Sequence, residues 1–254
     1  MTAAPRAGGR YAIYFAPTRR SALGRFGHAW LGTAARAADA QLTGVPGISL
    51  ARRDEITAEP RVYGFHATLK PPFALVNGQS EADLDLALAA FAAARASVEA
   101  SPLRLTQLDG FWALTLAQPS EAVDRLAADC VVRFDPFRKP PSDDELQRRR
   151  RAGLSPIQEA HLQRWGYPYV LGEFRFHMTL TARLAGAEAV LIGAHLGSPV
   201  EPLCRRALRL DAVALFHQPA PGERFNLVRR YPLQRLTATT MPINPFADRA
   251  AGRR

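Results

Sequence analysis

The chain has 254 residues, of which 47% are hydrophobic and 22% are charged. These proportions are typical of a globular protein that buries a substantial core. No run of about eighteen apolar residues occurs, so the sequence predicts no membrane span, and the first residues lack the apolar centre of a signal peptide. Two cysteines, Cys130 and Cys204, are too few for a disulfide framework and have no metal-ligand spacing. The composition predicts a cytoplasmic protein.

The formal net charge is +10, and nearly all of the positive charge is arginine, with Lys70 and Lys139 as the lysines. Combined with a high alanine content, this balance is explained by a biased nucleotide composition as readily as by selection for a basic surface. A positive field favours the capture of an anionic substrate. RNA is a second candidate partner, although charge alone does not establish it.

The first half of the chain alternates between segments typical of strands and of helices. In chain order these are a strand over 11–16 stopped by Pro17, a helix over 23–31, a loop around 44–47, a strand over 62–70, a helix from an N-cap at Ser80 to about residue 100, and a strand opening at 103–105.

The second half repeats this order, with one extra segment. It predicts a strand over 111–117, a helix from 119 through 130, two further helices beginning at Ser142 and around 158–165, a strand over 173–180, a helix over 187–195, and strands over 208–216 and 225–231. A duplicated set of parts predicts a single domain over 11–236, built from repeat halves of about 11–110 and 111–236 related by an approximate twofold axis. Residues 1–10 are predicted to be disordered, and 237–254 to form a basic flexible tail.

Two His-x-Thr sequences lie on predicted strands at equivalent places in the two halves. They begin at His66 and His177 and end at Thr68 and Thr179. A single His-x-Thr is weak evidence, because a lone histidine on a strand is usually structural and threonine is common in strands. Two of six histidines in the same pattern and in equivalent positions favour a functional role.

Strand periodicity predicts which side chains accompany each histidine. Residues two apart share one face of a strand, while the intervening residues are apolar and suit a core. The predicted polar faces are His66, Thr68 and Lys70 in the first half, and Arg175, His177, Thr179 and Thr181 in the second.

These side chains suit phosphodiester hydrolysis. One imidazole takes a proton from water while the other, protonated, supplies one to the departing alkoxide. Threonine hydroxyls bind the phosphate oxygens, and a cation offsets their charge. We therefore predict His66 and His177 as catalytic residues, and Thr68, Thr179, Lys70 and Arg175 as substrate-binding residues, with no metal and no cofactor. Lys70 and Arg175 are equally well explained as strand-end charges.

Other residues give weaker signals. Tyr63, Tyr167 and Tyr169 are explained as packing residues, with stacking on a base or sugar as the alternative. The remaining histidines have no partner at metal-ligand spacing.

At the two motifs the chain resembles the two-histidine phosphoesterase superfamily. The strings Tyr-Gly-Phe-His-Ala-Thr-Leu-Lys-Pro-Pro-Phe, Trp-Gly-Tyr-Pro-Tyr-Val and Phe-Arg-Phe-His-Met-Thr-Leu-Thr are similar to its DUF1045-like branch, which is named for phosphonate-utilisation operons. The resemblance covers about 11–236. It implies an α+β, bilobal fold in which two pseudo-symmetric lobes, each with an antiparallel sheet and helices, enclose an active-site groove.

The resemblance implies hydrolysis of a cyclic phosphodiester, with paired catalytic histidines at His66 and His177 and phosphate bound by Thr68 and Thr179. A ribose cyclic phosphate from carbon–phosphorus bond cleavage is the hypothetical substrate. One alternative is an RNA 2′,3′-cyclic or 2′-5′ phosphodiesterase. Another is a non-catalytic module that binds a nucleotide or RNA. The oligomeric state is not predicted by the sequence.

Overall fold

The computed structural model describes residues 9–33 and 47–235. Within these ranges the fold is α+β, with two antiparallel four-stranded sheets and seven α-helices. Of the terminal segments predicted to be disordered, residues 1–8 and 237–254 lie outside the described ranges, and Arg10 already belongs to the first strand.

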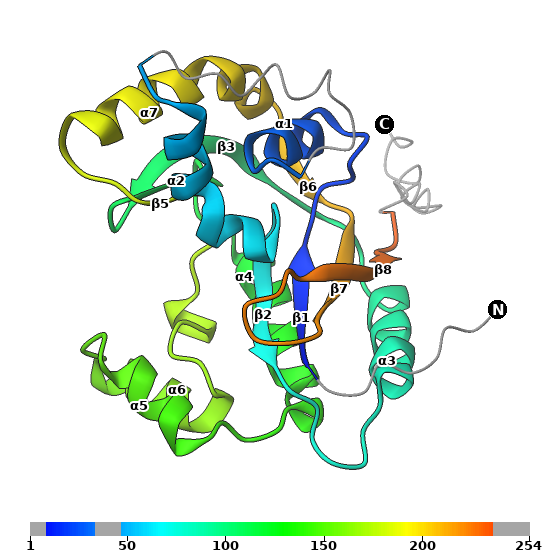
Figure 1. Cartoon of the computed structure of the whole chain (residues 1–254). Helices are drawn as coiled ribbons and strands as arrows, with labels where there is room; N and C mark the ends of the chain where they lie inside the picture. The colour runs from blue at the N-terminus through cyan, green and yellow to red at the C-terminus, as the bar shows by residue number, and fades with distance from the viewer. Residues whose placement is uncertain (1–8, 34–46, 236–254) are drawn as a thin grey trace, which may run out of the picture.

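The first sheet combines strands from both ends of the sequence. Its order is β2-β1-β7-β8, and every pair is antiparallel. The bounds are β1 Arg10–Phe15, β2 Ala67–Phe73, β7 Ala212–Gln218 and β8 Asn226–Pro232. All residues of β7 are buried, which explains its almost continuous apolar sequence. In Figure 1 the sheet lies at the centre of the molecule.

The second sheet has the order β5-β4-β3-β6 and is also antiparallel throughout. Its strands are β3 Val98–Leu108, β4 Phe111–Leu116, β5 His177–Arg183 and β6 Ala207–Leu210. In each sheet the strand bearing a His-x-Thr motif is an edge strand beside the first strand of its half. Strand β3 of the first half lies in the sheet of the second half, and β7 and β8 of the second half lie in the sheet of the first, so the two halves are interleaved.

The helices pack around the two sheets. Their bounds are α1 Ala22–Trp30, α2 Leu50–Tyr63, α3 Glu81–Ala93, α4 Glu121–Arg133, α5 Asp143–Arg150, α6 Pro156–Trp165 and α7 Gly186–Val200. Short 3-10 helices occupy Asp135–Phe137, Leu171–Glu173 and Glu201–Cys204. Helix α4 contacts both β2 and β3. One apolar cluster contains buried residues from both sheets, and the sheets therefore share a core.

Serine caps begin most of the helices, as the sequence indicates. Ser80, Ser142 and Ser155 each accept a backbone hydrogen bond, while the side chain three residues later bonds back to the serine. The last two caps start α5 and α6, the extra segment of the second half, which Figure 1 shows projecting at the lower left.

Several predicted elements differ from the structure. The strand predicted from residue 173 begins at His177, and the helix predicted to about residue 100 ends at Ala93, before β3. Helix α2 was not predicted, and it includes Val62 and Tyr63 from the predicted strand 62–70. Strand β2 instead runs past Pro71 and Pro72, which an edge strand tolerates because its outer N–H groups need no partner. The predicted strand 208–216 is divided between β6 and β7, which belong to different sheets.

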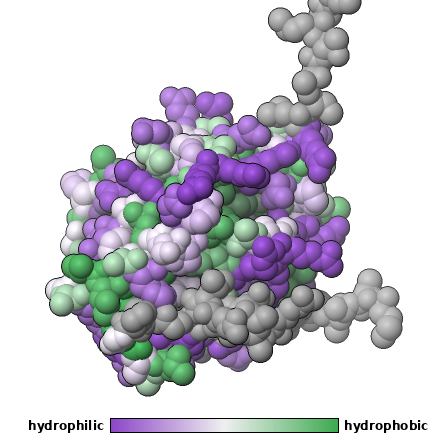
Figure 2. Space-filling view, turned by 90° about the horizontal axis from the view of Figure 1, so that it is seen from above, coloured by the Kyte–Doolittle hydropathy of each residue, from purple (hydrophilic) through white to green (hydrophobic). Residues whose placement is uncertain are grey.

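The surface mixes polar and apolar side chains. Figure 2 shows this for the face seen from above. Among the described residues, no helix has the length and apolar character that crossing a membrane requires.

Candidate functional site

The two motif histidines are held in the same way. His66 immediately precedes β2, and its Nδ1 lies 2.9 Å from the carbonyl oxygen of Gly64. His177 opens β5, and its Nδ1 lies 2.7 Å from the carbonyl oxygen of Arg175. A carbonyl can only accept, so we assign the proton of each neutral ring to Nδ1. The Nε2 atoms are then acceptors.

The acceptor of His66 already has a hydroxyl partner. Its Nε2 lies 3.1 Å from Oγ1 of Thr68, which donates in this tautomer. The carbonyl that holds the ring comes from Gly64, which ends helix α2 with a φ of 77°. This left-handed conformation favours glycine, so the turn between α2 and β2 fixes the histidine.

Aromatic rings support both imidazoles. Tyr14 on β1 is fully buried and stacks on His66 with ring centroids 3.8 Å apart. Its hydroxyl has no hydrogen-bond partner among the described residues, and burial raises the pKa of Tyr14 well above its ordinary value. Phe111 on β4 lies 5.9 Å from the His177 ring. These contacts restrict the orientation of both histidines.

Both imidazoles are neutral near pH 7. Burial lowers the pKa of His66 from 6.5 to about 4; the hydrogen bond to Gly64 opposes this shift, and the nearby His177 adds to it. Burial also lowers the pKa of His177, against its hydrogen bond to the Arg175 carbonyl. Because His177 affects the pKa of His66, the two rings belong to one electrostatic environment.

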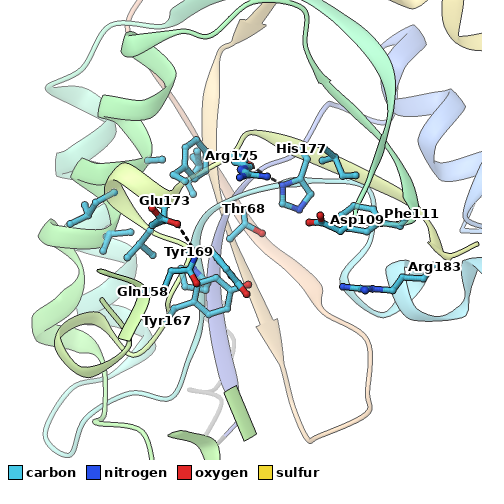
Figure 3. Close-up of a pocket in the computed structure, with 18 residues that line it drawn as sticks. Thr68, Asp109, Phe111, Gln158, Tyr167, Tyr169, Glu173, Arg175, His177 and Arg183 are labelled. Atoms are coloured by element: carbon cyan, nitrogen blue, oxygen red, sulfur yellow. Dashed lines mark hydrogen bonds between the residues drawn. The ribbon is translucent and has the colours of Figure 1, made fainter. Parts of the chain in front are cut away.

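Two adjoining pockets form a groove at these histidines. The first has a volume of about 440 Å³ and is lined by Thr68 and His177, among others. The second, of about 270 Å³, is lined by His66 and Thr179. Each pocket thus combines the histidine of one motif with the threonine of the other. Figure 3 shows His177 and Thr68 in the first pocket.

Phe111 and Arg183 line both pockets and so mark where they meet. The register of β4 and β5 places these two residues opposite each other. The two pockets are therefore parts of one groove.

The first pocket has a mixed lining of charges and aromatic rings. Arg175 and Arg183 provide cations, and Asp109 and Glu173 provide carboxylates. Glu173 accepts a hydrogen bond of 2.7 Å from the Gln158 amide.

Tyr167 and Tyr169 form an edge-to-face pair on another wall of this pocket, with ring centroids 5.7 Å apart. The guanidinium of Arg149 on α5 lies 4.6 Å from the Tyr167 ring centroid. The extra helical segment therefore supports one wall of the groove.

The structure brings five of the six predicted site residues to the groove, namely His66, His177, Thr68, Thr179 and Arg175. Thr181, predicted on the same face, also lines the second pocket.

Lys70 does not reach the groove, which corrects the predicted shared face of His66, Thr68 and Lys70. Between Thr68 and Lys70, strand β2 advances two residues while β1 advances one, a β-bulge that shifts the alternation of side chains. The Lys70 ammonium is buried, donates to the carbonyl of Val131 at 3.0 Å and lies 3.9 Å from Asp135. Burial lowers its pKa to about 8.

Sequence reasoning missed Arg183, Asp109 and Phe111. Arg183 continues the alternation of His177 and Thr179, so strand periodicity contained a signal for it. Asp109 lies in the Asp-Gly turn between β3 and β4, where its φ of 44° and the 91° of the following glycine fit a tight hairpin.

Comparisons with known proteins identify relatives. A family described as a protein of unknown function, DUF1045, matches residues 68–226. Over 231 residues the chain is 39% identical to a protein named ribose 1,5-bisphosphate phosphokinase PhnN from Janthinobacterium sp. (strain Marseille), covering 88% of this chain and 50% of that protein. A protein of the same name from Laribacter hongkongensis (strain HLHK9) is 36% identical over 245 residues, covering 91% of this chain and 54% of that protein. The chain spans about half the length of these relatives.

These names contradict the predicted reaction. A phosphokinase is a transferase, so the predicted metal-independent phosphodiester hydrolysis and the hydrolase class are wrong by this comparison. The RNA phosphodiesterase and the nucleotide- or RNA-binding module agree no better with the names. The prediction of the reaction failed because imidazole and hydroxyl groups are not specific to hydrolysis. They serve any phosphoryl transfer, whether the base takes a proton from water or from a sugar hydroxyl.

Proposed function

The chain belongs to the DUF1045 family, and on that premise we propose that it binds a phosphorylated ribose in the groove between β2 and β5, as the sugar-phosphate-binding part of a phosphokinase-type protein. The observation that carries this proposal is the crossed pairing of histidines and threonines. Four groups from two distant motifs face one groove, where they can surround a single phosphate.

The threonine hydroxyls donate to phosphate oxygens, and Arg175 supplies a fixed positive charge beside His177. A phosphate dianion near the imidazoles favours their protonated forms and adds further donors. In a transfer reaction, a neutral imidazole accepts the proton of the sugar hydroxyl that attacks the phosphoryl group.

The carboxylates favour a sugar phosphate over a bare phosphate. Asp109 and Glu173 in the first pocket repel an anion, but they are acceptors for hydroxyl groups. A phosphorylated ribose presents anionic oxygens and hydroxyl donors together, as this lining requires. Inorganic polyphosphate has no hydroxyl donors to satisfy the carboxylates.

We assign the phosphoryl donor no site on this chain. The sequence contains no Gly-x-x-x-x-Gly-Lys-Ser/Thr loop, the arrangement that surrounds nucleotide phosphates in many kinases. The relatives are about twice as long as the region that matches, which leaves room for such a site elsewhere in them.

We further infer that the architecture is that of the two-histidine superfamily, with two related lobes. The matching strand orders of the two sheets and the equivalent carbonyl bonds of His66 and His177 support this relationship. This relationship covers the fold and the position of the site, and not hydrolysis.

Calorimetric titration of the purified chain with ribose 5-phosphate tests the proposal. The His66→Gln/His177→Gln variant should bind at least about tenfold more weakly, because each lost hydrogen bond to a charged group costs about 1.5–3 kcal/mol. His28→Gln is the matched control, since His28 lies on α1 and bonds Thr33 outside the groove.

Ribose and inorganic phosphate, titrated separately, should both bind more weakly than ribose 5-phosphate. Equal affinity of the wild type and the double variant for ribose 5-phosphate would refute the proposal.

A further inference from the structure

We propose that the groove accepts a sugar with phosphate groups at both ends, and that Arg183 binds the second phosphate. This inference rests on the proposed function, which places the first phosphate between His66 and His177. It assigns a binding role to a residue that lies outside both His-x-Thr motifs.

Arg183 is the last residue of β5 and lines both pockets. It follows Thr179 by four residues, so its Cα lies up to about 13 Å further along the strand. In this interval the register shift sets four residues of β5 opposite two of β4, which reduces the distance to about 7 Å. Arg183 is therefore a near neighbour of a phosphate bound by Thr179, and its long side chain can hold a second phosphate beside the first.

The side chain of Arg183 is directed by the neighbouring hairpin. Its Cβ and Cγ lie 3.8 Å from the position that a Cβ on Gly110 would occupy. In Figure 3 the guanidinium extends into the pocket below Asp109 and Phe111, away from His177. The guanidinium thus faces the part of the groove that the first phosphate leaves open.

The charge of Arg183 is available to a ligand. Among the hydrogen bonds and ion pairs within 9–33 and 47–235, its guanidinium has no carboxylate partner. Other arginines near acidic residues, such as Arg52 and Arg150, form bidentate pairs with Glu188 and Glu159. The planar guanidinium matches a phosphate with two parallel hydrogen bonds.

The carboxylates of the groove make this cation necessary for a second phosphate. Asp109 adjoins Arg183 at the hairpin, and Glu59 lines the second pocket with it. Without Arg183, the remaining arginine of the first pocket would be Arg175, which the first phosphate occupies, so a second dianion near these carboxylates would be disfavoured. We therefore expect this end of the groove to distinguish ligands by charge, according to whether they carry a second phosphate.

The test compares ribose 5-phosphate with ribose 1,5-bisphosphate by calorimetric titration. The wild type should bind the bisphosphate at least about tenfold more tightly, as expected for a bidentate charged pair. Arg183→Gln should abolish this preference while changing the affinity for the monophosphate by no more than about twofold. Arg206→Gln is the matched control, because it removes one exposed positive charge outside the groove and should keep the preference.

The outcomes separate this inference from the proposed function. If Arg183→Gln weakens both ligands equally, or if the wild type shows no preference, Arg183 does not bind a second phosphate, whereas the proposed function stands. If the wild type binds neither ligand, the proposed function itself fails. Thermal unfolding of each variant confirms that it is folded before titration.

Discussion

The neutral state of His66 predicts a specific loss of stability in acid. Its pKa is 6.5 in the unfolded chain and about 4 in the folded protein, so between these values the unfolded chain binds more protons. The contribution of neutral His66 to the free energy of unfolding is therefore fully present above pH 6.5, and it is lost as the pH decreases toward 4. At pH 5 the difference amounts to about 2 kcal/mol, since each pKa unit corresponds to 1.36 kcal/mol.

The His66→Gln variant removes this titration. We expect the free energy of unfolding of the wild type to fall by about 2 kcal/mol more than that of the variant between pH 7.5 and pH 5. Urea unfolding of both proteins at both pH values, without phosphate in the buffer, measures this difference in the free energy of unfolding. All other titrating groups are common to both proteins and cancel in the comparison.

His28 provides an independent check. Burial lowers its pKa to about 4 as well, and the charge of Arg19 contributes. The double variant with His28→Gln should show both effects added, because His28 and His66 have no bonding partner in common. Parallel loss of stability in the wild type and His66→Gln would refute the lowered pKa of His66 in the folded protein.

Three further predictions follow from packing and charge. Gly27→Ala should destabilise the protein by about 1–3 kcal/mol in urea unfolding, because the new Cβ would lie 2.0 Å from the Phe65 ring. The control variant Gly197→Ala on α7 should keep the stability of the wild type, because its added Cβ would have no atom within 4 Å. Lys70→Met should change the affinity for ribose 5-phosphate by no more than about twofold in calorimetry, since the ammonium is buried away from the groove. The wild type should take up a proton when it binds ribose 5-phosphate, because the phosphate raises the lowered pKa of His66, whereas His66→Gln should not. Titrations in buffers of different ionisation enthalpy measure this proton uptake.

Local sequence patterns predicted much of the fold. The serine caps and the apolar strands are short-range signals, and the structure has elements at nearly all of the expected places. The predicted likeness to the DUF1045 family is confirmed. Helix α2 was missed because its residues are polar and its buried face is small, which leaves little periodicity to detect.

Tertiary features explain the remaining differences. The bulge that turns Lys70 into the core depends on how β2 pairs with β1, and no local pattern encodes that register. The division of 208–216 into β6 and β7 likewise depends on the position of the other strands. The groove was predictable because the two His-x-Thr sequences stand at the start of β2 and β5, where each histidine and the threonine two residues later line it. The reaction was not predictable, because the same groups serve several phosphoryl transfers.

The pairing of β1 with β7 has a consequence for biosynthesis. Arg10 lies opposite Gln218, 208 residues further along the chain. At a translation rate of about 5–20 residues per second, β1 waits on the order of 10–40 s for this neighbour to leave the ribosome. During that time the segment Tyr11–Phe15 has an exposed apolar edge, so we expect the nascent chain to depend on chaperones until its last strands are made.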